Sequence, residues 1–98
     1  MASSRTPLSE EELRTLLAER PEWSLQDGRL VRQWEFKDFV TAMDFVKSVA
    51  VLAELAQHHP DIDIRYNRVG LALVSHDAGG ITARDARMAR QLSAEFPA

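Results

Sequence analysis

Asp61-Ile-Asp-Ile-Arg-Tyr-Asn-Arg-Val-Gly-Leu-Ala-Leu-Val-Ser75 is the stretch that decides the fold, because it has the pattern of a β-hairpin. Between Asp61 and Tyr66, isoleucine and tyrosine alternate with charged residues, as expected of a strand with one buried face. From Val69 onward, valine and leucine again occupy every second position. Asn67-Arg68 is the predicted two-residue turn, since asparagine tolerates the left-handed backbone conformation.

Helices are predicted on both sides of this hairpin. The upstream helix begins at or beside Asp38, ends near His58 and is stopped by Pro60. Downstream, Thr82-Ala-Arg-Asp85 is a capping box that opens a last helix. Apolar residues recur at helical spacing in both segments. They are Ala42, Phe45, Val46, Val49, Ala53 and Ala56 in the first helix, and Met88, Ala89, Leu92 and Phe96 in the second.

The N-terminal part of the chain has the same order of elements. A capping box at Ser9–Glu12 opens a first helix, which Pro21 ends. Two short strands, residues 23–25 and 30–36, flank the tight-turn signal Asp27-Gly28, although Arg32 interrupts the apolar side of the second strand. The order α-β-β-α-β-β-α predicts a single α+β domain with a four-stranded antiparallel sheet covered on one face by helices.

Length and composition narrow the class of protein. A chain of 98 residues forms one domain, which we expect over residues 8–98, after a flexible tail over residues 1–7. Its net charge of −3 lacks the basic footprint of a nucleic-acid-binding protein. It has no cysteine, which excludes disulfides and thiolate zinc sites, and no apolar run approaches the roughly 20 residues that span a bilayer. We therefore expect a cytoplasmic protein with neither a nucleic-acid nor a membrane partner.

All three histidines fall between residues 58 and 76. His58 and His59 lie at the end of the long helix, and His76 ends the second strand of the hairpin, followed by Asp77 and a double glycine. Because histidine titrates near neutrality, three of them form a natural set for proton transfer. The alternative is two helix-end histidines and one strand-end histidine that do not meet in space.

Two carboxylates accompany the histidines. Glu54 lies four residues before His58 on the same side of the helix, where it either orients the imidazole or forms only an exposed pair. Asp85 is the third residue of its capping box, yet Met88 and Ala89 place it on the side of the helix that faces the protein. A carboxylate there must be paired, so Asp85 can serve both the cap and the site.

A zinc site formed by Glu54 and the three histidines is the rival chemistry. Neighbouring helical residues point about 100° apart, which makes it awkward for His58 and His59 to bind one ion. We therefore expect no metal. Trp23 is by composition a core residue rather than a platform for a ligand.

Four blocks of sequence resemble the signature of the pterin-4a-carbinolamine dehydratases. The blocks are Glu54-Leu-Ala-Gln-His-His-Pro60, Tyr66-Asn-Arg-Val69, His76-Asp77 and Thr82-Ala-Arg-Asp85. The spacing between them also matches, and the resemblance extends from Leu8 to Phe96, including Trp23. His-His-Pro alone is a weak signal, whereas all the blocks in register are specific.

This resemblance implies the same α-β-β-α-β-β-α fold and a dehydration reaction. The implied substrate is 4a-hydroxytetrahydropterin, the spent cofactor of aromatic amino acid hydroxylases, and the products are quinonoid dihydropterin and water. No cofactor is implied, because no electrons move. The residues implied are His58, His59 and His76 as the acid/base set, Glu54 and Asp85 as supporting groups, and Trp23 and Pro60 beside the substrate.

The resemblance further implies a homodimer or homotetramer, with the long central helix at the subunit contact. Val51 and Leu55 suit that contact, because they lie nearly opposite the main apolar stripe of the helix. Two other functions stay open. One is a non-catalytic binding module, as in animal members that bind a homeodomain transcription factor, and the other is a role in another pterin pathway such as molybdopterin metabolism.

Overall fold

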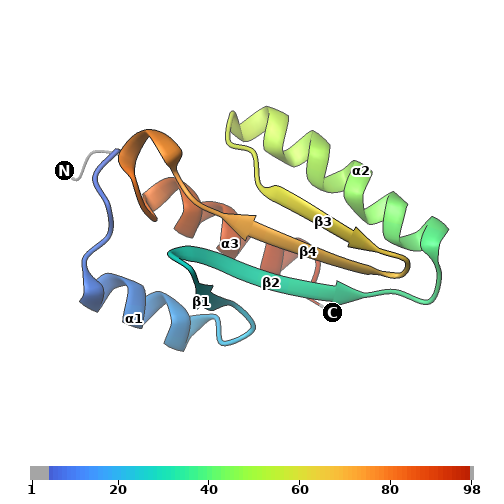
Figure 1. The fold of residues 1–98 in the computed structure, drawn as a ribbon, viewed down its shortest axis with the longest axis horizontal. Coiled ribbons are helices and arrows are strands. Elements are labelled where there is room, and N and C mark those ends of the chain that lie inside the picture. Colours follow the sequence, from blue (N-terminus) through green and yellow to red (C-terminus); the bar gives the residue numbers. More distant parts are fainter. Residues whose placement is uncertain (1–4, 98) are drawn as a thin grey trace.

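The computed structural model describes residues 5–97 and has the predicted order of elements (Figure 1). The elements are α1 (Glu10–Glu19), β1 (Ser24–Gln26), β2 (Arg29–Glu35), α2 (Phe39–Ala56), β3 (Asp61–Arg65), β4 (Arg68–Leu73), the short 3-10 helix η1 (His76–Ala78) and α3 (Ala83–Glu95). Both predicted capping boxes are present, at Ser9 and at Thr82, and the Asp38 side chain caps α2.

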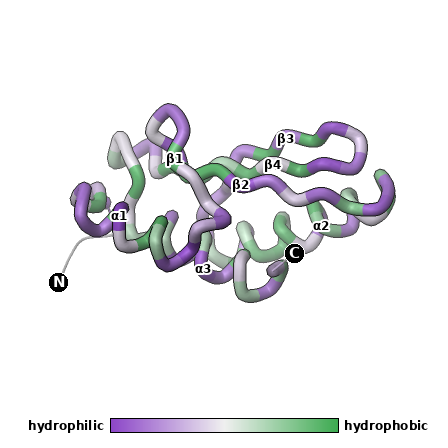
Figure 2. Tube along the Cα trace, turned by 90° about the horizontal axis from the view of Figure 1, so that it is seen from below, coloured by the Kyte–Doolittle hydropathy of each residue, from purple (hydrophilic) through white to green (hydrophobic). Residues whose placement is uncertain are grey.

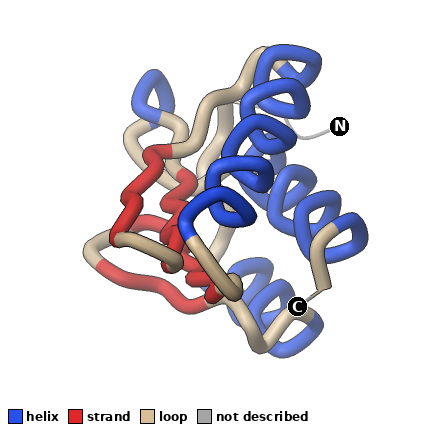
Figure 3. The backbone as a smooth tube through the Cα atoms, turned by 90° about the vertical axis from the view of Figure 1, so that its right-hand side faces the viewer, coloured by secondary structure: helices blue, strands red, loops and turns tan. Residues whose placement is uncertain are grey.

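The four strands form one antiparallel sheet in the order β1-β2-β4-β3. Asp27 and Gly28 join β1 to β2 with φ of 50° and 75°, the positive values that a type I′ hairpin turn requires. All three helices lie on one face of the sheet (Figures 2 and 3). The predicted α+β architecture is therefore confirmed, with β3 at one edge of the sheet.

The core lies between the sheet and this helical layer. Val69, Leu71 and Leu73 of β4 are fully buried, and Leu30 lies beside Leu73 on β2. Phe45 of α2 packs against them through a cluster of aromatic rings. The large apolar side chains of β4, which alternate in the sequence as predicted, thus face the helices.

Arg32 accounts for the imperfect alternation of β2. Its side chain is buried and its guanidinium lies 4.2 Å from the centre of the Trp34 ring. The guanidinium donates to Ser93 Oγ at 3.0 Å and to the Pro97 carbonyl at 2.9 Å, and it pairs with Glu22 at 3.5 Å. A buried cation is tolerated here because its donors are paired.

The hairpin of β3 and β4 differs from its prediction in two ways. The expected buried face of β3 is wrong, because all of its residues are exposed, with Ile62 at 39% and Ile64 at 38%. The strand lies at the edge of the sheet, where it pairs only with β4. The turn comes one residue earlier than predicted: Tyr66 takes the left-handed conformation, with φ of 53°, and the Asn67 side chain donates to the Phe36 carbonyl at 2.7 Å.

The start of α2 is as predicted, whereas its C-terminal end and its buried stripe need a small correction. Leu52 joins the buried stripe, whereas Ala56 is exposed because the helix ends there. The helix therefore stops two residues before His58.

Residues 5–7, which belong to the predicted tail, contact the domain. Pro7 forms a β-bridge with Thr82, and the Leu8 amide donates to the Ile81 carbonyl at 2.7 Å. The rest of the predicted tail, residues 1–4, lies outside the described residues. Within residues 5–97, no helix is long and apolar enough to cross a membrane.

We expect Leu71→Ala to lower the free energy of unfolding by about 2–5 kcal/mol, because Leu71 is fully buried at the centre of the sheet and its loss leaves a cavity. Urea unfolding followed by tryptophan fluorescence measures the change. Arg14→Ala, an exposed change on α1, is the control and should stay within about 0.5 kcal/mol of the wild type. Equal stability of the two variants would contradict the assignment of Leu71 to the core.

Candidate active site

The end of α2 directs two adjacent histidines to different partners. Gln57 caps the helix in the left-handed conformation, with φ of 52°, and its amide bonds back to the last turn. The His58 amide also bonds back to the Ala53 carbonyl, at 3.1 Å. This reversal takes His58 and His59 off the helix axis before Pro60 leads into β3.

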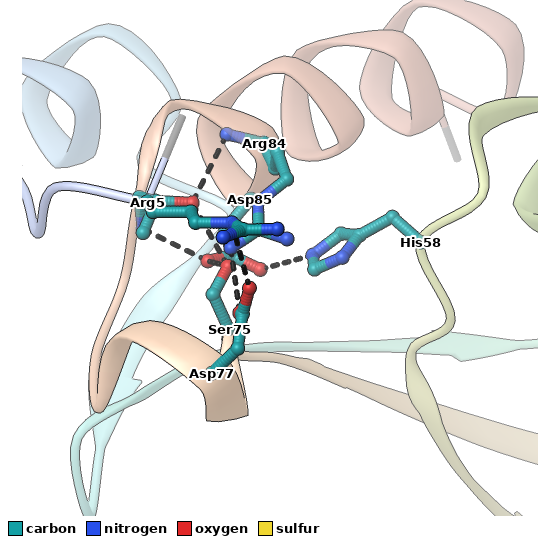
Figure 4. A network of polar contacts seen from close by, with 7 residues as sticks. Arg5, His58, Ser75, Asp77, Arg84 and Asp85 are labelled. Atoms are coloured by element: carbon teal, nitrogen blue, oxygen red, sulfur yellow. Dashed lines mark hydrogen bonds and ion pairs between the residues drawn. The ribbon is translucent and has the colours of Figure 1, made fainter. Parts of the chain in front are cut away.

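His58 points inward and contacts Asp85 of α3 (Figure 4). Its Nε2 lies 2.5 Å from Asp85 Oδ1, and the two side chains are only 10% and 0% exposed. Within residues 5–97 this is the only hydrogen bond of the ring, and none of its nitrogens is buried without a partner. Nδ1 of His58 therefore reaches solvent.

Asp85 is also held by the cap of its own helix and by Ser75, which follows β4. Its Oδ2 accepts from the Thr82 backbone N–H at 2.9 Å, which completes the capping box of α3, and from Ser75 Oγ at 2.8 Å. The positive end of the α3 dipole adds to these donors. Asp85 thus completes the predicted capping box and also contacts His58, while its predicted role in the site stays a prediction.

His59 points outward and contacts Glu54, with Nε2 2.5 Å from Oε2. Both side chains are more than half exposed. The predicted pairing of Glu54 with His58 is therefore wrong. The i, i+4 spacing applies only within a helix, and the left-handed Gln57 has already turned the chain at this point.

The prediction that His76 ends a strand is wrong, because β4 stops at Leu73 and His76 is the exposed first residue of η1. The residue before His76 is Ser75, whose hydroxyl donates to Asp85. Ser75 therefore connects His76 to the contact between His58 and Asp85. Next to His76, Asp77 accepts from Arg84 at 2.7 Å and pairs with Arg5 at 3.6 Å. The hydrogen bond from Arg84 lowers the pKa of Asp77 below its ordinary value, and both arginines add to the effect.

Comparison with known proteins places these features in a family. The family model described as pterin 4 alpha carbinolamine dehydratase matches residues 6–95. The chain belongs to this family. Two bacterial relatives carry the provisional name of a pterin-4-alpha-carbinolamine dehydratase. The protein of Chloroflexus aurantiacus is 56% identical over 84% of this chain and 88% of its own length, and that of Acidobacterium capsulatum is 60% identical over 80% and 85%.

A solved structure agrees with the family assignment. The crystal structure of a transcriptional coactivator/pterin dehydratase from Brucella melitensis superposes with a TM-score of 0.84 and 38% sequence identity. The match covers 91% of this chain and 97% of the Brucella chain. The resemblance read from the sequence blocks is therefore confirmed at the level of family and fold.

The two residues that the resemblance places beside a pterin lie in different surroundings. Pro60 is half-buried and adjoins the two histidines. Trp23 lies in the core at 2% exposure, packs edge-on against Trp34 and donates from Nε1 to Ser93 Oγ at 2.9 Å. Trp23 is therefore a core residue, as composition favours, and no contact within residues 5–97 joins it to a histidine.

The surface near the histidines is shallow. The hollow that borders His58 has a volume of about 30 Å³, which suits one water molecule. Two larger hollows lie elsewhere, one between α1 and α3 and one between α2 and α3. Among the described residues, no three histidine, aspartate or glutamate side chains gather as a metal site would require. Within residues 5–97, the surface at the histidines is therefore open rather than an enclosed pocket.

Sequence reasoning assigned no role to Ser75, which the structure places at the centre of the polar network. The signal was present in the alternation of β4. Ser75 occupies the same parity as Val69, Leu71 and Leu73, so its hydroxyl had to face the core and find a partner there.

We expect Asp77→Asn to destabilise the chain above about pH 4 and to have little effect below it. The lowered pKa of Asp77 means that its carboxylate stabilises the fold above the unfolded pKa, and this contribution is lost as the pH falls through the folded value. Urea unfolding of both proteins across a pH series measures the difference. Asp44→Asn is the control, since Asp44 is exposed and forms no ion pair within residues 5–97. A pH-independent difference for Asp77→Asn would contradict the charge-based role.

Proposed function

We propose that this chain is a cytoplasmic enzyme that dehydrates 4a-hydroxytetrahydropterin to quinonoid dihydropterin and water, using histidines as general acids and bases. In the cell this reaction would serve tetrahydropterin recycling after aromatic hydroxylation. The observation that carries the proposal is the pair of histidine–carboxylate contacts beyond α2, one buried and one exposed. Membership of the family supplies the substrate class.

The reaction is a redistribution of protons, and it balances without a redox partner. The proton on N5 of the pterin leaves to a base, a double bond forms between N5 and C4a, and the C4a–O bond breaks. The departing hydroxyl takes a proton from an acid and leaves as water. Histidine suits both roles, since it gains and loses a proton near neutral pH.

The geometry divides the three histidines into two kinds. His59 and His76 are exposed, so a substrate on the surface reaches their rings directly. Glu54 is placed to orient the ring of His59. His58 is held by Asp85 through Nε2, so Nδ1 is the ring nitrogen that this contact leaves for a substrate. We assign proton transfer to this set, with Pro60 and the backbone beside it limiting how the pterin ring can approach.

We expect His59→Ala and His76→Ala each to lower kcat/KM for 4a-hydroxytetrahydropterin by about 10²–10⁴-fold, the usual contribution of a general acid or base. Freshly generated substrate is mixed with enzyme, and dihydropterin formation is followed by absorbance. Arg14→Ala, an exposed change on α1, is the control and should leave the rate unchanged.

A wild type no faster than buffer would overturn the dehydratase proposal. The chain would then be a binding module, the other function named for the Brucella protein, and its partner would be sought by pull-down. A fast wild type with fully active histidine variants would keep the reaction and reject the histidines as its acid and base.

We also propose that a second copy of this chain covers the outer face of α2, giving a homodimer or homotetramer. Val51 and Leu55 are 62% and 83% exposed there, and they line a hollow between α2 and α3. Arg87 and Glu95 flank the same hollow with opposite charges. A two-fold contact places such a surface against itself, so apolar residues and opposite charges on one patch can pair with their own copies.

We expect Leu55→Arg to reduce the mass of the particle in solution, because it places a charge in the proposed contact. Sedimentation equilibrium or light scattering after gel filtration measures the mass. Leu25→Arg is the matched control, since Leu25 is another exposed leucine, at 47%, on β1. A monomeric wild type, or an unchanged mass for Leu55→Arg, would reject α2 as the contact.

A further inference from the structure

We propose that Ser75 is a positioning residue whose buried hydroxyl fixes the tautomer of His58, so that Nδ1 is the nitrogen that His58 presents to the substrate. The proposal rests on the proposed function for its effect on turnover. Its structural part concerns only Ser75, Thr82, Asp85 and His58 and can be measured without any substrate.

The direction of each hydrogen bond follows from a count of donors. The Ser75 side chain is 1% exposed, and its Oγ lies 2.8 Å from Asp85 Oδ2 and 2.8 Å from Thr82 Oγ1. A hydroxyl has one proton to donate, and an ionised carboxylate can only accept. Ser75 therefore donates to Asp85, and Thr82 donates to Ser75. Thr82 Oγ1 accepts from the backbone N–H of Arg84 at 3.2 Å through a lone pair, and this leaves its own proton to be donated to Ser75.

This series of hydrogen bonds ends on the Asp85 carboxylate, and it leaves His58 only the role of donor to that carboxylate. With Oδ2 of Asp85 occupied by Ser75 and the Thr82 amide, Oδ1 is left for His58 Nε2, at 2.5 Å. Nε2 must then carry the proton and donate it. In a neutral imidazole the other nitrogen is the acceptor, so Nδ1, which reaches solvent, is the basic atom.

Ser75 also joins the two segments that carry the reactive groups. Its side chain reaches Asp85, which holds His58, and its peptide bond continues directly into His76. Its backbone pairs with Gly80, which closes the loop around η1. A single buried residue thus couples the placement of His58, whose contact with Asp85 is drawn in Figure 4, to that of His76.

Long-range ¹⁵N–¹H NMR of the histidine rings at neutral pH tests the structural part. We expect wild-type His58 in the Nε2–H form alone. In Ser75→Ala, Asp85 loses one of its donors, and the His58 signals should shift toward a mixture of tautomers. Ser75→Thr keeps the hydroxyl and should restore the wild-type spectrum.

Turnover tests the functional part. We expect Ser75→Ala to lower kcat by about tenfold to 10²-fold with KM within a factor of two, and Ser75→Thr to recover it, because misplacement of a reacting group by about 1 Å has an effect of this size. Ser93→Ala is the matched control. It also removes a buried, hydrogen-bonded hydroxyl, but one that bonds Trp23 and Arg32 rather than the histidines.

The outcomes separate the two proposals. A wild-type His58 in the Nδ1–H form overturns the inference even if Ser75→Ala fails to fold. A folded Ser75→Ala with the wild-type tautomer and kcat also overturns it, and so does an equal loss of kcat in Ser93→Ala. If the wild type has no dehydratase activity, the proposed function falls, whereas the tautomer measurement still decides the role of Ser75.

Discussion

Asp85 is a carboxylate with no exposed surface, and a group of this kind is tolerated only where each oxygen is paired. Two of its partners come from segments that precede α3 in the sequence, and the third is the cap of α3 itself. They are His58 beyond α2, Ser75 at the end of β4, and Thr82 at the start of α3. Because an unpaired buried charge is costly, these contacts hold the three segments together. The turn after α2, which carries His58 and His59, and the η1 turn, which carries His76, are thus both attached to Asp85.

The same constraint explains why the histidines differ. His58 completes the set of donors to Asp85, so it is drawn inward and its orientation is fixed. His59 is its immediate neighbour, yet no buried group remains for it, and it turns to the exposed Glu54. His58 and His59 are adjacent in the sequence, but only the ring of His58 is buried. This difference in burial decides that the His58 ring is fixed and the His59 ring is accessible.

Most of the fold could be predicted from the sequence, because the signals that set it are local. Capping residues, the Asp27-Gly28 turn and the periodicities of two and of 3.6 each act within a few residues. The dual role of Asp85 was predictable too, since it follows from a capping box on the inner face of a helix. The buried Arg32 was visible only as a break in the pattern, because its partners Glu22 and Ser93 come from other segments.

The pairing of Glu54 failed for a related reason. It depended on where α2 ends, and that end is set by a left-handed glutamine, Gln57, which sequence preferences do not single out as they do glycine. Likewise, the alternation of β3 separates its apolar side chains from its charged ones, but it does not predict that either set is buried. Burial depends on which strand becomes the edge of the sheet. Side-chain partners across the fold require the packing of all the elements, and this is the part that local patterns omit.

The shallow surface around the histidines has a consequence for the proposed chemistry. A deep pocket would exclude water and strengthen each electrostatic contact, whereas an open one lets exposed rings exchange protons with solvent between turnovers. Dehydration takes one proton from the substrate and gives one back, so its acid and base must both return to their starting states in each cycle. Exposed His59 and His76 can do so through solvent, while the inward side of His58 stays closed by Asp85. The division between one buried and two exposed rings thus suits a reaction that consumes no protons overall.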